Sequence, residues 1–170
     1  MSGLAALFQR DAWPLQSWTA PLPEFEAFVD KAEAFPDTRV LLLDGATLPD
    51  GPRLFRVLAA GLRFPAYFGS NWNALDECLH DLEWLKESTV LLAVRNAQRL
   101  LEQEPEGLAI LLRILASATK ALEEPVMGEV CLIRIPIQLR VLLHANGDVT
   151  RAQLEQRLKQ AGCELPEFRG

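Results

Sequence analysis

Residues 64–85 read FPAYFGSNWNALDECLHDLEWL, and this stretch says most about what the chain does. It opens with a short aromatic loop that contains a Gly-Ser pair, and a helix follows. Ser70 is expected to cap this helix, because a serine hydroxyl accepts a hydrogen bond from a free backbone N–H of the first turn. Pro65 and the glycine favour a rigid, shaped loop, which would hold Tyr67 and Phe68 beside the start of the helix.

At about 100° per residue, this helix has two different faces. One arc is apolar and predicts burial; it consists of Trp72, Leu75, Cys78, Leu79 and Leu82. The opposite arc is polar and consists of Asn73, Glu77, His80 and, if the helix lasts that long, Trp84, with Asp76 and Asp81 on its margins. Any solvated helix shows a polar outer face. Trp84 and the aromatic loop favour a binding surface instead, because large apolar side chains are poor choices for a solvated face.

These residues resemble the barstar family of intracellular barnase inhibitors. The matching positions of the loop and helix are Tyr67, Gly69, Asn71, Ala74, Leu75, Cys78 and Leu79. The resemblance extends outward without a gap to Leu42, Asp44 and Gly45, with family apolar positions at Leu54, Leu58, Leu62 and Phe64. It continues less specifically through residues 90–92 and 108–122, so that roughly half of the chain is covered.

The resemblance implies a function and a binding surface. In the barstar family a tyrosine, its loop and the following acidic helix plug the active site of a ribonuclease. Carried over to this chain, the partner-binding residues are Tyr67, Phe68, Gly69, Asn71, Asn73, Asp76, Glu77, His80, Asp81 and Trp84. The implied partner is a basic ribonuclease or nuclease toxin. The implied protein is a bacterial inhibitor or immunity protein, not an enzyme, with no catalytic residue, cofactor or metal.

The chain departs from the family on this face. Glu77 stands where the family has its most important aspartate, Asn73 replaces a second aspartate, and Asp76 replaces a tryptophan. Acidic residues of a later helix become Ser117 and Ala121. The binding face is therefore retuned, and barnase itself is not implied as the target. A second hypothesis keeps the scaffold as a protein-interaction module with a partner that is not a ribonuclease.

Composition and charge agree with a single domain that binds a basic partner. The chain has 170 residues, of which 49% are hydrophobic, enough for a buried core. Its formal net charge of -6 and its isoelectric point near 5.0 argue against binding to nucleic acid or to an anionic membrane. An acidic inhibitor can compete with RNA for the positive field of a ribonuclease and gain association rate.

Three cysteines without a CxxC spacing make a disulfide framework or a zinc site a poor interpretation. Cys78 is expected to pack as a small apolar residue. Reduced thiols and the lack of a visible signal peptide predict a cytoplasmic protein. No apolar run reaches the roughly 18 residues that a membrane span needs.

Apolar periodicity predicts an α/β fold with a small three- to four-stranded, mainly parallel sheet packed against helices. Helices are expected at residues 23–34, 52–62, about 96–104, 106–123 and 150–161, and strands at 39–43 and 89–94. The third core strand is either 130–135 or 139–144, and 139–144 is preferred because it runs into an Asn-Gly turn. The other run is then an edge strand or the first arm of a hairpin.

The chain divides into three expected parts. Residues 1–38 form an N-terminal extension with one helix, in which Trp13 and Trp18 dock onto the core. Residues 39–145 form the barstar-like domain, and residues 146–170 a C-terminal helical extension.

Motifs for catalysis are weak. His144 could in principle meet Cys78 or Cys131, but no nucleophile motif surrounds either cysteine. Asp76 and His80 are four residues apart and could share a metal, yet no second cluster of ligands is obvious. The glycines form neither a GxGxxG motif nor a phosphate-binding loop.

Overall fold

The main sheet has four parallel strands in the order β1-β6-β3-β2. The computed structural model describes residues 3–128 and 132–170. The strands are β1 Leu15–Thr19, β2 Thr38–Asp44, β3 Thr89–Arg95 and β6 Gln138–Ala145. The predicted α/β class with a small parallel sheet is therefore confirmed.

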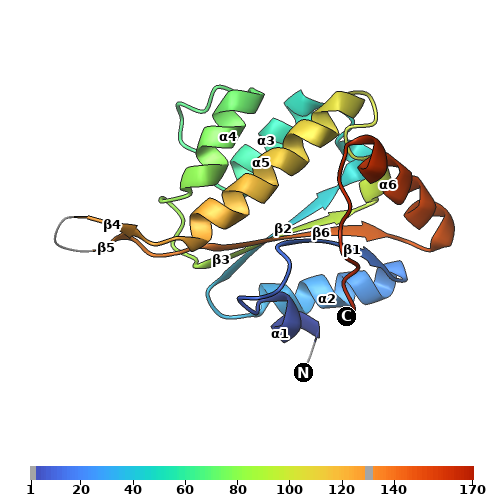
Figure 1. The fold of residues 1–170 in the computed structure, drawn as a ribbon, viewed down its shortest axis with the longest axis horizontal. Helices are drawn as coiled ribbons and strands as arrows, with labels where there is room; N and C mark the ends of the chain where they lie inside the picture. Colours follow the sequence, from blue (N-terminus) through green and yellow to red (C-terminus); the bar gives the residue numbers. More distant parts are fainter. Residues whose placement is uncertain (1–2, 129–131) are drawn as a thin grey trace.

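Helices cover both faces of this sheet (Figure 1). The helices are α1 Gly3–Leu7, α2 Leu22–Glu33, α3 Gly51–Gly61, α4 Trp72–Asp81, α5 Pro105–Glu123 and α6 Asp148–Gln160. Helices α1 and α2 lie on one face, and α3, α4 and α5 on the other. The larger apolar core lies under α3, α4 and α5, and the smaller one is centred on Phe25 of α2 and Trp18 of β1. Burial from both sides explains why β3 and β6 are almost continuously apolar.

The four helices predicted with both bounds, which correspond to α2, α3, α5 and α6, are confirmed to within two residues at each end. The helix expected after the aromatic loop is confirmed as α4 and ends at Asp81. The helix expected at 96–104 is wrong: only a single 3₁₀ turn, Ala97–Arg99, forms there. Leu101 then takes a left-handed φ of 55°, which an α-helix does not accommodate. None of the helices within the described residues is both long and apolar enough to cross a membrane.

The preferred third core strand is confirmed, because β6 contains residues 139–144 and lies between β1 and β3. The alternative run contributes β5 Leu132–Arg134, which pairs antiparallel with β4 Val126–Met127. It is thus the second arm of a small hairpin, rather than the first; residues 130 and 131 of this run lie outside the described residues. The hairpin projects from the body of the protein (Figure 1).

Strand β1 was not expected, and it joins the N-terminal segment to the sheet. Its sequence, LQSWT, is short and half polar, so that it carries little strand signal. Trp18 is buried against Phe25, Phe28 and Phe168, as expected of a docking residue. Trp13 is exposed, so the same expectation was wrong for it.

A buried arginine fastens the N-terminal segment. Arg140 of β6 is fully buried, and its guanidinium donates to the backbone oxygens of Leu7 and Gln9, both at 3.0 Å. It also pairs with Glu123 at 2.5 Å. An arginine can be buried at this position because its charge and its N–H groups are matched.

Candidate functional site

The loop and helix that the sequence singled out form one unit, which we call the loop–helix surface: residues 64–70 and α4. Asn71 caps α4, since its Oδ1 accepts from the N–H of Ala74 at 2.8 Å and its Nδ2 donates to the oxygen of Gly69 at 3.2 Å. The expectation that Ser70 is the cap was wrong. Ser70 has a left-handed φ of 51°, whereas Asn71 has the extended backbone that a cap requires.

The apolar face of α4 is confirmed. Leu75, Cys78 and Leu79 are buried, as is Leu82 just beyond the helix, and Trp72 is half-buried. Burial raises the pKa of the Cys78 thiol first, and the nearby Asp81 and Glu77 raise it further. The thiol is therefore protonated at neutral pH, and it packs as a small apolar group.

Trp84 does not belong to the outer face, contrary to expectation. Helix α4 ends at Asp81, and Leu82 turns the chain with a left-handed φ of 48°. The indole Nε1–H of Trp84 donates to the oxygen of Leu62 at 2.8 Å, and its ring meets Phe64 edge-on at 6.0 Å. Trp84 is half-buried and braces the base of the loop.

A row of aromatic rings holds the loop in place. Trp72 packs edge-on against Phe55 of α3 at 4.9 Å, and Phe68 lies between Phe55 and Phe64, at 6.4 and 4.9 Å. The loop also closes a turn, in which the N–H of Phe68 donates to the oxygen of Pro65 at 3.0 Å. Phe68 thus packs against the core and anchors the loop, while the neighbouring side chain at the tip of the loop is exposed to solvent.

That neighbour is Tyr67, which is 75% exposed. Desolvation raises the pKa of Tyr67. The Cys78 thiolate, which forms only at the high pH where a phenol titrates, and the negative charges of Asp81, Glu83 and Glu77 raise this pKa further. The phenol therefore lies within the field of the acidic flank of α4. Tyr67, Glu77 and Asp81 share one side of the molecule, as a single contact surface requires.

The other flank of α4 is tied to α5 through His80. Its Nδ1 lies 2.8 Å from the backbone oxygen of Asp76 and 3.0 Å from the Asp76 carboxylate, and its Nε2 lies 2.8 Å from the hydroxyl of Ser117. Arg134 of β5 donates to the oxygens of His80 and Ala121, both at 3.1 Å. Both ring nitrogens of His80 are therefore engaged, and the ends of the two helices are clamped together.

A further brace, which the sequence did not indicate, fixes the start of α4. Glu104 accepts from the indole Nε1–H of Trp72 at 3.1 Å and from the backbone N–H of Gly51 at 2.7 Å. Gly107 lets α5 approach this indole, because a Cβ there would lie 2.9 Å from the ring. These contacts join residues that are far apart in the sequence. The sequence offers only two weak indications of them, a glycine and an acidic residue near the start of a helix.

The ten expected partner-binding residues fall into two groups. Those whose side chains or backbone are exposed are Tyr67, Gly69, Asn71, Asn73, Asp76 and Glu77. Those that are half-buried are Phe68, His80, Asp81 and Trp84. Among the described residues, the carboxylates of Glu77 and Asp81 take part in no ion pair.

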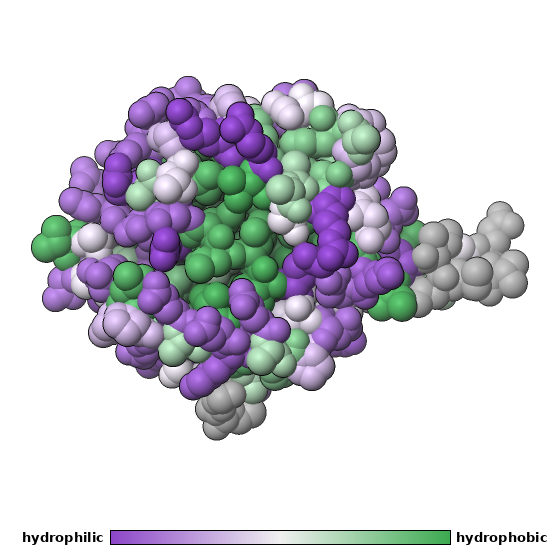
Figure 2. Space-filling model, turned by 180° about the vertical axis from the view of Figure 1, so that it is seen from behind, coloured by the Kyte–Doolittle hydropathy of each residue, from purple (hydrophilic) through white to green (hydrophobic). Residues whose placement is uncertain are grey.

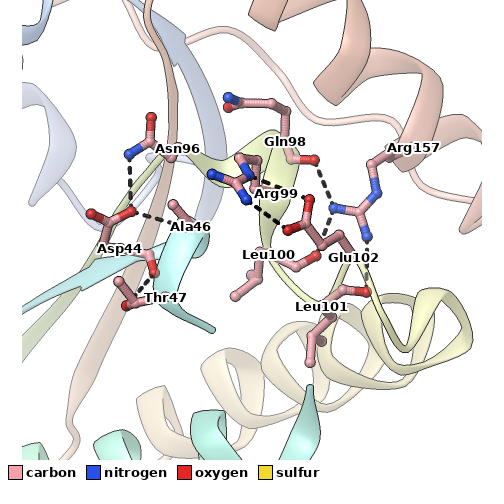
Figure 3. A network of polar contacts seen from close by, with 10 residues as sticks. All are labelled: Asp44, Ala46, Thr47, Asn96, Gln98, Arg99, Leu100, Leu101, Glu102 and Arg157. Atoms are coloured by element: carbon pink, nitrogen blue, oxygen red, sulfur yellow. Dashed lines mark hydrogen bonds and ion pairs between the residues drawn. The ribbon is translucent and has the colours of Figure 1, made fainter. Parts of the chain in front are cut away.

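A second polar cluster lies where β2 and β3 end, a common ligand position in parallel sheets (Figure 3). Asp44 accepts from Ala46 at 3.0 Å, Asn96 at 2.9 Å and Arg95 at 3.0 Å. Burial alone would raise the pKa of Asp44, but the hydrogen bonds from Asn96 and Ala46 and the charge of Arg95 outweigh it and lower the pKa. Gly45 is required here, since a Cβ would lie 2.3 Å from the oxygen of Asn96.

In the same cluster Arg157 of α6 donates to the backbone oxygens of Gln98, Leu100 and Leu101 at 2.9, 2.6 and 3.3 Å (Figure 3). Asp44, Arg99, Glu102 and Arg157 all find partners within this cluster, whereas Oε1 of Gln98 is buried without one among the described residues. This cluster therefore fastens α6 and the 3₁₀ turn to the sheet, and the loop–helix surface remains the better candidate site.

The residues considered for catalysis do not meet. His144 is buried and stacks on Phe25 at 4.1 Å, and its Nε2 lies 2.8 Å from the oxygen of Ala20. Burial lowers the pKa of His144. Cys78 lies on the other side of the sheet, and Cys131 lies outside the described residues. Within residues 3–128 and 132–170, no three His, Cys, Asp or Glu residues are grouped so as to hold a metal.

Solved structures show that the fold recurs elsewhere. The Aeropyrum pernix ORC2 protein in its ADP form has a TM-score of 0.59 at 13% identity, over 91% of this chain and 41% of that one. The Pyrobaculum aerophilum CDC6P structure has a TM-score of 0.53 at 11% identity, over 91% and 38%. This chain thus spans about two fifths of their length, and at such identity the likeness concerns the fold alone. In this chain only Ala20 and Pro21 separate β1 from α2.

A comparison with curated proteins finds no significant match. The model of the family described as "Barstar (barnase inhibitor)" matches residues 38–133, which is more than half of the chain. The match includes β2, α3, the whole loop–helix surface, β3 and α5. The chain belongs to the barstar family.

Proposed function

We propose that this protein binds a basic ribonuclease through the loop–helix surface and blocks its active site. The observation that carries the proposal is the placement of Tyr67. The tip of the loop is exposed beside Glu77 and Asp81, which form no ion pair within the described part of the chain, while the residues around it are braced from behind. A rigid, preorganised surface of this kind loses little conformational entropy on binding.

Each exposed residue has a role in this proposal. The ring of Tyr67 packs on the partner, and Glu77 imitates a substrate phosphate that meets arginine, lysine or histidine in the enzyme. Asn73 supplies hydrogen bonds, and Asp76 and Asp81 steer the approach from the rim. Gly69 and Asn71 give the surface its shape.

The half-buried residues support this surface in our proposal. Phe68 anchors the loop and His80 joins α4 to α5. Trp84 braces the loop from below, instead of acting as the contact residue that the sequence suggested.

Charge supports a basic partner. The chain carries a formal net charge of -6, and no cation of residues 3–128 or 132–170 pairs with Glu77 or Asp81. Burying such a carboxylate in an interface is costly unless the partner supplies a positive charge. A nuclease that binds RNA phosphates offers such charges, and their attraction raises the association rate most at low salt.

The test is affinity capture from cell extract and culture fluid, with the wild type, Glu77→Lys and Glu33→Lys as parallel baits. Glu33 is an exposed acid of α2, on the opposite face of the sheet, so it makes the same charge change away from the site. The captured proteins are identified and assayed for RNA cleavage. We expect a basic nuclease that binds the wild type and Glu33→Lys, is inactive while bound, and is lost with Glu77→Lys.

Other outcomes separate the remaining hypotheses. A partner without nuclease activity that is lost only with Glu77→Lys would keep the surface and replace the function. A partner that binds Glu77→Lys as well as wild type would show that the loop–helix surface is not the binding site. A captured nuclease that stays active while bound would contradict inhibition.

A further inference from the structure

The two edges of the main sheet are treated differently. The outer edge of β1 is covered by the chain's own C-terminal tail, because Ser17 donates to the oxygen of Pro166 at 3.0 Å and accepts from the N–H of Phe168 at 2.7 Å. Strand β2 pairs with β3 along its inner edge, and no described segment pairs with its outer edge. An uncovered edge strand is a template for a further strand.

The backbone groups that β2 offers follow from its pairing. The N–H of Thr89 donates to the oxygen of Asp37 at 3.2 Å, and in a parallel ladder only alternate residues bond to the neighbour. Residues 39, 41 and 43 therefore face β3. Thr38, Val40 and Leu42 turn their N–H and C=O groups outward.

The side chains along this edge are apolar. Leu42 is 40% exposed, and Val40 and Leu41 are partly exposed. Val40 packs against the smaller core under α2, and Leu41 packs against the larger core on the opposite face, so each is only partly covered. Seen from this side, the molecule has an apolar hollow ringed by hydrophilic residues (Figure 2). Such a patch on a soluble protein marks an interaction site.

We propose that a second copy of this chain covers the edge, with the two β2 strands antiparallel about a two-fold axis at Leu41. In this register Val40 faces Leu42 of the second copy, and Leu41 faces Leu41. Arg39 faces Leu43, and Asp44 faces the hydroxyl of Thr38. At the centre of this pairing apolar residues oppose apolar residues, and along its whole length no like charges stand directly opposite each other.

The charges at the ends of β2 permit this self-pairing. Arg39 is paired with Glu87 at 2.5 Å, and Asp44 with Arg95 at 3.0 Å, within each chain. An antiparallel pair about such an axis keeps each face of the sheet on its own side. Val40 and Leu42 of both copies then form one apolar layer between the two α2 helices, and the hollow is filled.

The interface uses no residue of the loop–helix surface, so it stands or falls independently of the ribonuclease proposal. The two contacts also differ in their response to salt. Two copies with a net charge of -6 repel each other, so screening strengthens the dimer. Binding of an acidic surface to a basic enzyme weakens under the same change.

Sedimentation of the full chain from micromolar to millimolar concentration, at low and high salt, tests the proposal. We expect a monomer–dimer equilibrium that favours the dimer in high salt. Leu42→Lys should weaken the dimer by at least about tenfold, because it places two lysines at the core of the pairing. Val149→Lys changes an apolar residue on α6 that is more exposed, 74% against 40% for Leu42, and should leave the equilibrium unchanged.

Amide hydrogen exchange provides a second readout that does not depend on a variant. Protection at Val40 and Leu42 should rise with protein concentration. A chain that remains monomeric throughout, a dimer that Leu42→Lys leaves intact, or a dimer without added protection in β2 would each overturn the proposal. Circular dichroism of Leu42→Lys ensures that the variant is folded, as expected for a half-exposed position.

Discussion

Removing Glu104 should loosen the start of α4 without touching the binding surface itself. Its carboxylate accepts from the indole of Trp72 at 3.1 Å and from the backbone N–H of Gly51, at the start of α3, at 2.7 Å. A hydrogen bond to a charged group contributes about 1.5–3 kcal/mol when buried. Because Glu104 is half-buried, we take the lower value of about 1.5 kcal/mol for each of its two hydrogen bonds. Glu104→Ala should therefore lower the free energy of unfolding by about 3 kcal/mol.

The variant Glu104→Gln separates the two contacts. In the wild type each carboxylate oxygen accepts from a different donor, so the amide oxygen of glutamine can replace only one of them and its NH₂ group faces the other donor. We expect a loss of about 1.5–2 kcal/mol, between the wild type and Glu104→Ala. For a chain of this size, the loss of about 3 kcal/mol in Glu104→Ala corresponds to a fall in melting temperature of about 6–12 °C.

Urea unfolding, followed by circular dichroism and by tryptophan fluorescence, measures these losses. Glu106→Ala, an exposed acid in the first turn of α5, is the matched control and should cost less than about 0.5 kcal/mol. If Glu104→Ala costs no more than this control, the brace does not hold the site and the reasoning is refuted. Equal losses for Glu104→Gln and Glu104→Ala would show that the two donors do not contribute separately.

Three further predictions concern single residues. Gly107→Ala should cost about 1–3 kcal/mol in urea unfolding, since its Cβ would lie 2.9 Å from the indole of Trp72; a neutral result would contradict the close packing. Asp44 has a lowered pKa in the folded state, so its ionised side chain stabilises the fold fully above its ordinary pKa, and this stabilisation is lost as the pH falls below that value. Asp44→Asn should therefore lose less stability than the wild type between about pH 5 and pH 3. An unchanged slope of stability against pH would refute this prediction. Tyr67 is the single tyrosine of the chain, so an absorbance titration should find its midpoint above the ordinary value, and Asp81→Asn should bring it down; a midpoint unaffected by Asp81→Asn would separate the phenol from the acidic flank.

The parts of the site that depend on periodicity could be predicted, and those that depend on backbone geometry could not. The apolar face of α4 follows from spacing, and Leu75, Cys78 and Leu79 are buried as expected. The cap was misplaced by one residue because Ser70 and Asn71 are both good caps, and only the backbone angle distinguishes them. The end of α4 was missed because Leu82 takes the left-handed conformation there. In most sequences a glycine at this position marks the end of a helix.

The fold shows the same division. Strands β2, β3 and β6 are apolar runs with clear turns, and they were predicted at nearly their observed limits. Strand β1 is recognisable only from its partner, since its pairing with β6 and the burial of Trp18 are contacts with distant residues. Arg140 is a similar case: no local pattern marks an arginine that is buried because the backbone of residues 7 and 9 meets it.

The pairing of β1 with β6 also constrains how the chain is made. Leu15 leaves the ribosome more than one hundred residues before Val141, its neighbour in the sheet. Strand β1 therefore has no partner strand until β6 has been synthesised. Contacts of such long sequence separation slow folding and leave strand edges exposed in the meantime. A translation product that stops before β6 would keep much of the loop–helix surface and yet leave its N-terminal strand without a place in the sheet.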